Sequence, residues 1–446
     1  MGLSDIHLAE LHQRARAAGV PGFRMLTREQ LIEALEDGGE PAEAVEAEPA
    51  AAQEEEAEER APGRRRRRRR GRRPDDTEAE PAARERTERE PAPEREPAAE
   101  DEAETEEVSG VLDGLPQGYG FLRLQGLEPA EGDIYVSASQ IRRCELLPGD
   151  EVSGPARPPR RGEHHRALVR VASVNGQEPE GERVTFEDLT PVAPHRRLAL
   201  GDSSEPLARA VDLIAPLALG QRVLVLAEPR SGRTTLLRAI AAALAGGEVR
   251  VRVLLADERP EEVTEWKRAL PEAEIVAAPA DQEPAEQVRA AELAIGNAKR
   301  RAEAGEDVVV IIDSLSRLAL GYRDPNRVKR LFGAGRELAE EGSGSLTVIA
   351  TVLDADDRGE EVRELLETTE NVMLRLDPSF AAQGIVPALA VAECSVAGEE
   401  KLRSESELEA IRALRGELLG LEPADAARLV GERIAGSSSN AELLGL

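Results

Sequence analysis

Aromatic residues, lysine and cysteine are all scarce in this chain of 446 residues. Aromatics make up 2% of the sequence, so each one is worth locating individually. Only four of the 58 basic residues are lysine, so arginine supplies nearly all of the positive charge. The two cysteines, Cys144 and Cys394, lie far apart, which argues against a disulfide or zinc framework and fits a reducing compartment.

Long apolar runs are also missing. No stretch approaches the length of a membrane span, and the first residues lack the apolar region of a signal peptide. We therefore expect a cytoplasmic protein with no membrane partner. The formal net charge is −29, but acidic and basic residues fall in separate blocks. Since local charge governs binding, the negative sum does not exclude nucleic acid as a partner.

The N-terminal part divides into two segments of different composition. Residues 1–38 place apolar side chains at helical spacing, with a capping box formed by Thr27 and Gln30, and predict a small helical module. Residues 39–107 contain Val45 as their only large aliphatic side chain, and we expect this insert to be disordered. An arginine block, residues 64–70 with 72 and 73, lies inside it.

Residues 108–176 have the rhythm of a small β-barrel. Short β-type runs are separated by glycine, proline and aspartate turns, and they read VSGVLD, GYGFLRL, DIYVS, DEVSG and HRALVRVASV. This spacing is typical of the oligonucleotide-binding barrel. Residues 177–199, rich in glycine, proline and glutamate at their start, form the predicted linker.

Residues 200–446 alternate apolar strands with helical stretches, which predicts a parallel sheet covered on both faces. The predicted strands read RVLVLA, VRVLLA, EIVAA, DVVVII, LTVIAT and NVMLRL. The predicted helices cover residues 234–245, 261–270, 284–304, 326–341 and 360–369.

One loop in this region has the context of a phosphate-binding P-loop. The segment AEPRSGRTTLL, residues 227–237, follows a strand and opens a helix. Backbone amides of such a loop and the helix N-terminus favour phosphate. Gly232 and Thr234 match the usual G-x-x-x-x-G-K-[ST] pattern, whereas Ala227 replaces the first glycine and Arg233 replaces the lysine.

Carboxylates follow two other strands of the predicted sheet. Asp313 ends DVVVIID, where a carboxylate holds the water shell of magnesium in nucleotide sites. Asp257 and Glu258 follow VRVLLA, where a carboxylate can activate water. Each carboxylate alone is compatible with a solvated strand end. Together with the P-loop they favour a nucleotide site.

Two aromatic residues stand out in the barrel. Tyr119 and Phe121 are two apart on one strand and therefore share a face. They either belong to the core or stack on nucleic-acid bases, with Arg123 meeting backbone or a base edge. Glycines at 118 and 120 and the shortage of aromatics favour stacking. The arginine block at 64–73 either binds phosphate or is neutralised by neighbouring glutamates.

Several motifs together resemble the Rho family of bacterial transcription termination factors. They are DERPEEVTE, VIIDSLSRLALGY, RLFGAGRELAEEGSGSLTVIAT, GYGFLR and DIYVSASQIRR. The resemblance covers nearly the whole chain except the insert. It implies a multi-domain fold with a small N-terminal helical module, a cold-shock-like OB β-barrel and a C-terminal RecA-like α/β P-loop ATPase domain.

The family's functional positions can be carried over one by one. The implied nucleotide contacts are Ala218, Leu219, Gly220, Gln221, Arg222, Val223, Arg230, Ser231, Gly232, Arg233, Thr234, Thr235 and Arg259. Among the catalytic residues (Glu258, Asp313 and Arg233), Glu258 is the implied general base. The implied cofactors are ATP and Mg²⁺, with Thr234 and Asp313 at the metal. Implied RNA contacts are Tyr119, Phe121, Arg123, Asp133 and Arg358.

The chain departs from the family in four places, all of which bear on hydrolysis or translocation. Arg233 replaces the P-loop lysine, and a guanidinium is larger and planar. The glycine-rich RNA loop is shortened to GYRDPNRVK, Ala397 stands where the arginine finger is expected, and Gly384 replaces a basic residue. In the barrel, His165 stands where the family has a further aromatic residue.

Two hypotheses follow from these observations. By family, the chain binds single-stranded RNA, hydrolyses ATP as a homohexamer and terminates transcription, with RNA polymerase as a further partner. Alternatively, it is a non-catalytic paralogue that binds RNA and nucleotide as a regulator or assembles with a second member of the family. A rotary or secretion-type ATPase subunit is disfavoured because neither explains the barrel.

Overall fold

The computed structural model describes residues 32, 35, 105–179, 183–322 and 324–446. The predicted N-terminal module with Thr27 and Gln30, nearly all of the insert and its arginine block lie outside these residues. The chain divides into two units, Met1–Pro91 and Ala92–Leu446, and the strands β1 to β15 and helices α3 to α14 all belong to the second unit. Within the described part of the chain, no helix combines the length and apolar character that a membrane crossing needs.

The first part of this unit is a small closed barrel. Its strands hydrogen-bond in the order β1-β2-β3-β5-β4-β6, and a further pairing of β1 with β4 closes it. Alternate side chains of these strands, among them Leu112, Leu122, Ile134 and Val152, fill its core. The elements are β1 (Glu106–Gly114), β2 (Gly120–Arg123), β3 (Ile134–Val136), α3 (Ala138–Arg143), β4 (Glu151–Arg157), β5 (Ala167–Leu168) and β6 (Ser173–Val174).

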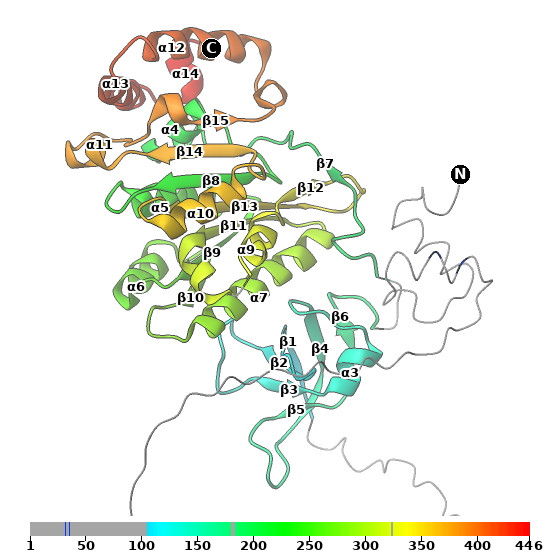
Figure 1. Ribbon diagram of the computed structural model, residues 1–446. Coiled ribbons are helices and arrows are strands. Elements are labelled where there is room, and N and C mark those ends of the chain that lie inside the picture. The colour runs from blue at the N-terminus through cyan, green and yellow to red at the C-terminus, as the bar shows by residue number, and fades with distance from the viewer. Residues whose placement is uncertain (1–31, 33–34, 36–104, 180–182, 323) are drawn as a thin grey trace, which may run out of the picture. The chain divides into compact units, whose positions relative to one another are not determined.

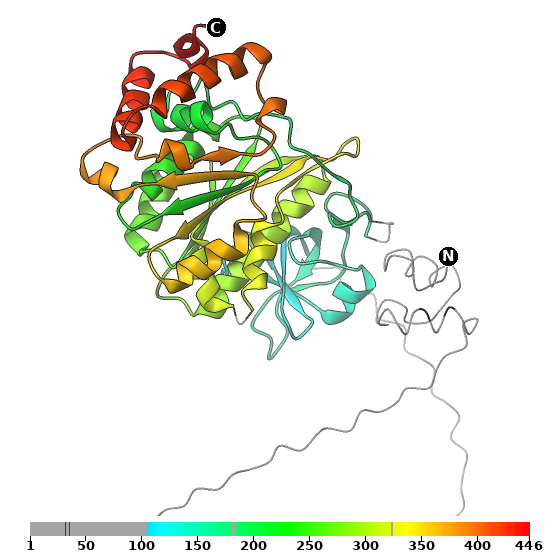
Figure 2. The same ribbon diagram turned by 45° about the horizontal axis from the view of Figure 1, so that its top comes forward.

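The second part is a nine-stranded sheet with helices on both faces (Figures 1 and 2). The main path runs β10-β9-β11-β13-β8-β14-β15, and β12 and β7 extend it beside β13. Its strands are β7 (Pro191–Val192), β8 (Arg222–Ala227), β9 (Arg250–Ala256), β10 (Glu274–Ala278), β11 (Asp307–Asp313), β12 (Arg336–Leu338), β13 (Ser345–Leu353), β14 (Val372–Leu376) and β15 (Ser395–Val396).

Helices connect these strands and cover the sheet. The α-helices are α4 (Pro206–Ile214), α5 (Arg233–Leu244), α6 (Pro260–Ala269), α7 (Pro284–Glu303), α8 (Leu315–Leu318), α9 (Asn326–Phe332), α10 (Asp357–Leu366), α11 (Pro378–Ala382), α12 (Glu405–Leu418), α13 (Pro423–Ala435) and α14 (Asn440–Leu444). The 3₁₀ turns are η4 (Ala319–Gly321), η5 (Val391–Glu393) and η6 (Glu399–Lys401).

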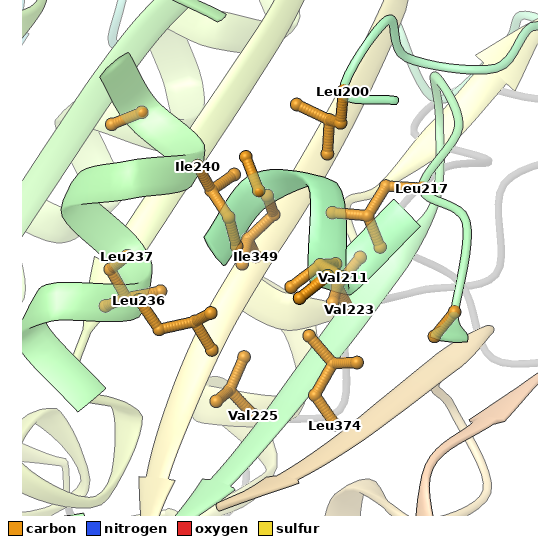
Figure 3. Close-up of a cluster of buried hydrophobic side chains, with 14 of the residues drawn as sticks. Leu200, Val211, Leu217, Val223, Val225, Leu236, Leu237, Ile240, Ile349 and Leu374 are labelled. Atoms are coloured by element: carbon orange, nitrogen blue, oxygen red, sulfur yellow. The ribbon is translucent and has the colours of Figure 1, made fainter. Parts of the chain in front are cut away.

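The sheet has two cores because successive strand residues point to opposite faces. Val223 and Val225 of β8 pack with Leu237 and Ile240 of α5 on one face (Figure 3). Leu224 of β8 belongs to the core on the other face, with α7 to α10. Continuous apolar strands therefore bury both sets of side chains, as the pattern RVLVLA predicts.

The six predicted strands of the sheet form at their predicted places, and β5 and β6 divide the predicted strand HRALVRVASV in two. The predicted helix at residues 326–341 is wrong beyond Phe332. α9 ends there, and Gly333 and Gly335 lead into β12, which pairs antiparallel with β13. A Cβ on Gly335 would come within 2.9 Å of the Gln221 carbonyl oxygen, so the chain turns where only glycine fits. Tertiary pairing here outweighs helix propensity.

Candidate nucleotide and RNA sites

The loop between β8 and α5 has the geometry of an anion site. Gly232 forms the N-cap of α5 with a φ of 87°, and Arg230 also has a positive φ, of 69°. The backbone N–H and the hydroxyl of Ser231 both donate to the Glu228 carbonyl, at 3.3 and 2.8 Å. The first amides of α5 have no acceptor within the helix, so they are oriented to bind an anion.

Two carboxylates lie beside this loop because β9 and β11 end at the same edge of the sheet. Asp313 is the last residue of β11 and pairs in register with Leu255 of β9, and Glu258 follows β9 by two residues. Glu258 is 8% exposed and Asp313 is 1% exposed. Burial raises the pKa of the Asp313 carboxyl, and the guanidinium of Arg233 opposes that rise.

Arg233, the first residue of α5, bridges the two carboxylates. Its Nη2 donates to Glu258 Oε1 at 2.8 Å, and its Nε lies 3.0 Å from Asp313 Oδ1. Arg317 of α8 is a second cation on Glu258, with Nη1 2.8 Å from the same Oε1. Arg317 Nη1 also donates to the Asp257 carbonyl at 2.6 Å. The site thus pairs two guanidinium groups with two nearly buried carboxylates.

These groups surround a cavity of about 490 Å³. Its lining includes seven of the residues predicted from the sequence: Arg230, Gly232, Arg233, Thr234, Thr235, Glu258 and Arg259. Ser231 and Asp313 are buried directly behind this lining. Arg317 also lines the cavity, although it was not among the residues predicted from the sequence. Its position within the motif DSLSRLALGY, four residues after Asp313, is the signal that would have found it.

Residues 218–223 lie elsewhere. They form the turn before β8 and its first two residues, at the opposite end of the strand from the P-loop. A strand of six residues spans about 20 Å, so these residues do not reach the cavity. Their contacts are structural: Gly220 N donates to Thr347 Oγ1 at 2.9 Å, and Arg222 Nη1 donates to the Gly335 carbonyl at 2.8 Å. The structure does not bring this stretch to the phosphate loop.

The barrel presents a cluster of aromatic rings. Tyr119, Phe121 and Tyr135 are all half-buried, and their ring centroids lie 5.6 to 6.1 Å apart. Phe121 of β2 pairs in register with Tyr135 of β3, which places both rings on one face. The ring of His165, which is exposed, lies 5.0 Å from Phe121. Rings that remain accessible on a barrel face can stack on nucleic-acid bases.

Tyr135 was not among the residues predicted to contact RNA. The sequence could have indicated it, because DIYVS is the next predicted strand after GYGFLR and has Tyr135 at its centre. Only the strand pairing shows that Tyr135 and Phe121 are direct neighbours.

Arg123 and Asp133 are brought together, but not on the surface. Arg123 is 6% exposed and Asp133 is 3% exposed. The Arg123 guanidinium forms short ion pairs with Asp133 and Asp113, and Asp113 also accepts from Arg289 of α7. Arg123 CZ lies 5.8 Å from the centroid of the Phe121 ring. Arg123 therefore lies against the buried side of the aromatic cluster. Its positive charge is balanced by the carboxylates of Asp113 and Asp133.

Comparisons with known proteins agree with this division. Residues 108–180 match the family "Rho termination factor, RNA-binding domain", and residues 208–395 match the "ATP synthase alpha/beta family, nucleotide-binding domain". The chain is 38% identical over 366 residues to transcription termination factor Rho of Aquifex aeolicus, covering 76% of this chain and 84% of that protein. The chain belongs to the Rho family of transcription termination factors.

Other Rho proteins match along a similar length. Rho of Pseudomonas aeruginosa is 38% identical over 368 residues, covering 76% of this chain and 87% of that protein. Rho of Bacillus subtilis is 39% identical over 341 residues, covering 70% and 79%. The resemblance to Rho and the order of a barrel before a P-loop domain, both inferred from the motifs, are thus confirmed.

The segment where Rho is expected to carry an arginine finger has none at the aligned position. Ala397 follows β15 and is exposed. The nearest arginine, Arg403, is 6% exposed, and its Nη2 donates to the carbonyls of Asp212 and Leu213 at 2.7 and 2.9 Å. Its Nε donates to Glu399 at 2.7 Å. Arg403 is therefore buried, and its Nε and Nη2 donors are directed at acceptors of its own chain.

Two of the remaining positions compared with Rho, Arg358 and Gly384, are exposed. Arg358 lies in the first turn of α10 and has no ion pair among the described residues. Gly384 follows α11, is exposed and has a φ of 71°. The shortened connection after η4 leads into α9 within a few residues. Arg358 is therefore an exposed cation, and the connection adds Arg327, which pairs with Glu292, and Lys329.

Proposed function

We propose that this chain acts in the cytoplasm as a Rho-type termination factor that binds single-stranded RNA on its barrel and hydrolyses ATP at its P-loop. The observation that carries the proposal is the presence of both sites in one chain that matches Rho over most of its length. Relatives named transcription termination factor Rho make RNA polymerase the expected partner.

The barrel supplies the RNA contact through Tyr119, Phe121 and Tyr135. Stacking on an aromatic ring contributes about 1–3 kcal/mol per base and tolerates many sequences. Arg123 and Asp133 hold the rings in place, and Arg358 is the cation that we assign to the second RNA contact. As a ring, the chain assembles with copies of itself into a homohexamer or joins a second member of the family.

At the P-loop, the amides from Arg230 to Thr235 bind the phosphates, and Arg259 contributes a further charge. Glu258 acts as the general base through Oε2, because Oε1 is shared by Arg233 and Arg317. Arg317 orients this carboxylate and balances charge that develops at the phosphates.

Magnesium, when bound with the nucleotide, would neutralise phosphate charge. Thr234 and Asp313 are the predicted ligands. Thr234 lines the cavity, whereas the contacts of Asp313 do not suit a direct ligand of the ion. Asp313 Oδ1 faces both Arg233 Nε and Thr351 Oγ1, at 3.0 and 2.9 Å. No step of the proposed function is therefore assigned to a metal ion.

Phosphate release from ATP by the purified chain, with and without a cytosine-rich RNA, tests the function. We expect RNA to stimulate release and Glu258→Gln to abolish it. RNA binding is measured separately by fluorescence anisotropy, where Tyr135→Ala and Phe121→Ala each weaken binding by about 1–3 kcal/mol. Val169→Ala, an exposed barrel position, is the control. RNA binding without any turnover would contradict the hydrolytic role and favour the non-catalytic paralogue.

A further inference from the structure

The position of the Arg233 guanidinium points to an unusual way of binding nucleotide. This side chain is 12% exposed and lies between carboxylates that come from two different strands of the sheet. Nη2 faces Glu258 and Nε faces Asp313. Among the described residues, Nη1 donates no hydrogen bond. One edge of the planar group thus holds the carboxylates, and one nitrogen is left for another ligand.

The buried carboxylate of Asp313 gives a physical reason for the position of the Arg233 guanidinium. The carboxylate is 1% exposed, and its Oδ2 has no hydrogen-bond partner among the described residues. An ionised carboxylate so deeply buried requires a positive neighbour. Arg233 provides that charge from within the chain, at the position where a nucleotide site otherwise relies on a divalent cation and its water shell.

The charged residues around the whole cavity also indicate that arginine supplies the positive charge that a divalent cation would otherwise supply. Four arginines line it (Arg230, Arg233, Arg259 and Arg317). Three glutamates line it as well (Glu228, Glu258 and Glu262), and Asp313 lies behind them. With all four of these carboxylates ionised, their charges match those of the four guanidinium groups, and Asp257 adds a further carboxylate 3.7 Å from Arg317. A divalent cation therefore meets little excess of negative charge from the protein, whereas a triphosphate entering the cavity finds guanidinium donors already in place.

We infer that Arg233 takes the place of the divalent cation, so that this site binds a nucleoside triphosphate with little dependence on metal. The inference rests on the proposed nucleotide binding and deepens it. Arginine can do this where lysine cannot, because its five donors lie in a rigid fork. That fork holds both carboxylates and offers Nη1 to a phosphate oxygen. A lysine ammonium is a single point charge, and it leaves Asp313 to a metal ion.

Isothermal titration of ATP into the full-length protein, once with excess Mg²⁺ and once with EDTA, tests this inference. We expect the Kd of the wild type to agree within about threefold between the two conditions. In Arg233→Lys, binding should become at least about tenfold tighter with Mg²⁺ than with EDTA. Arg412→Lys, an exposed position on α12, makes the same replacement away from the cavity and should behave as the wild type.

The outcomes separate the inference from the proposed function. Wild-type binding that weakens tenfold or more in EDTA overturns the metal-independent site and leaves the nucleotide site standing. No ATP binding in either condition overturns both, and RNA binding by the same sample shows that the protein is folded. The wild-type comparison requires no substitution, so it decides the matter even if Arg233→Lys does not fold.

Discussion

Among single residues, Arg403 shows that the position of an arginine in the sequence does not establish a role as an arginine finger. It is the arginine nearest to the place where a Rho finger is expected, yet it is buried and donates to two backbone carbonyls and to Glu399. Its role is therefore to satisfy acceptors between η6 and the end of α4. A finger must reach the nucleotide of a neighbouring chain, which a buried side chain that donates through Nε and Nη2 to its own chain does not do.

Replacing Arg403 with Gln should therefore lower stability. We expect the free energy of unfolding to fall by about 1–3 kcal/mol, because buried carbonyls and a carboxylate lose a charged donor. Urea denaturation followed by circular dichroism measures this change. Arg412→Gln on the exposed face of α12 should shift stability by no more than about 0.5 kcal/mol. Unchanged stability combined with lost ATP hydrolysis would instead favour a finger role for Arg403.

Glu399 provides a pH-dependent test of the same contact. Burial opposes ionisation, but hydrogen bonds from Arg415 and Arg403 outweigh it and lower the pKa of the Glu399 carboxyl below its ordinary value of 4.5. A lowered folded-state pKa contributes stability that is present above 4.5 and is lost as pH falls through the folded value. The pair with Arg415, at 2.7 Å, and the pair with Arg403 are then both weakened.

Glu399→Gln should accordingly destabilise the protein at pH 7, and the difference from the wild type should shrink below about pH 4.5. Urea denaturation at pH 7, 5.5 and 4 measures this trend. The adjacent, exposed Glu400→Gln is the control and should show no such dependence. A difference that stays constant across this range would show that the Glu399 charge contributes no stability.

At the scale of elements, the turn before β8 is held by a close backbone approach. Gly220 has a φ of 79°, and a Cβ there would lie 2.2 Å from the Glu337 backbone nitrogen. β12, which contains Glu337, pairs with both β13 and β7. The turn thus supports the edge of the sheet, in agreement with its distance from the nucleotide cavity.

Gly220→Ala should cost more than about 2 kcal/mol of unfolding free energy, since left-handed backbone and steric overlap add together. Gly416→Ala in α12 is a matched control, because an added Cβ meets nothing within 4 Å. That control should be neutral or stabilise the helix by up to about 1 kcal/mol. Thermal unfolding of both variants provides the comparison. Equal changes in Tm for Gly220→Ala and Gly416→Ala would contradict a structural role for the turn.

At the scale of the whole molecule, charge is distributed unevenly. The chain carries a net charge of −29, yet nine arginines are concentrated at positions 64–70, 72 and 73. This block lies outside the described residues. Because arginines that contact phosphate release counterions, they make RNA affinity depend on salt. The alternative is that neighbouring glutamates neutralise the block.

Replacing these nine arginines with glutamine in the full chain distinguishes the two cases. If the block binds RNA, the slope of log K against log salt should become shallower by about 0.7 for each phosphate contact that is lost. RNA titrations followed by fluorescence anisotropy at several salt concentrations between about 50 and 300 mM measure this slope. An unchanged slope would indicate that glutamates neutralise the block.

Local sequence patterns were enough to predict the order of the parts and most of the strands of the sheet. Strands such as RVLVLA are apolar at every position, and such runs are stable only when both faces are covered. Local patterns also predicted the phosphate loop, since a glycine with positive φ before a helix is a local requirement. Local rules failed at residues 333–341, where pairing with β13 replaced a predicted helix by β12.

Which charged groups meet could not be predicted from local sequence and depends on the packing of distant segments. Arg233, Glu258 and Asp313 are separated by tens of residues and come together because β8, β9 and β11 all end at one edge of the sheet. The same holds for Phe121 and Tyr135, which strand register places side by side. It also holds for Arg403, whose acceptors lie on α4. Propensity and spacing act over a few residues, whereas these contacts depend on packing between distant segments.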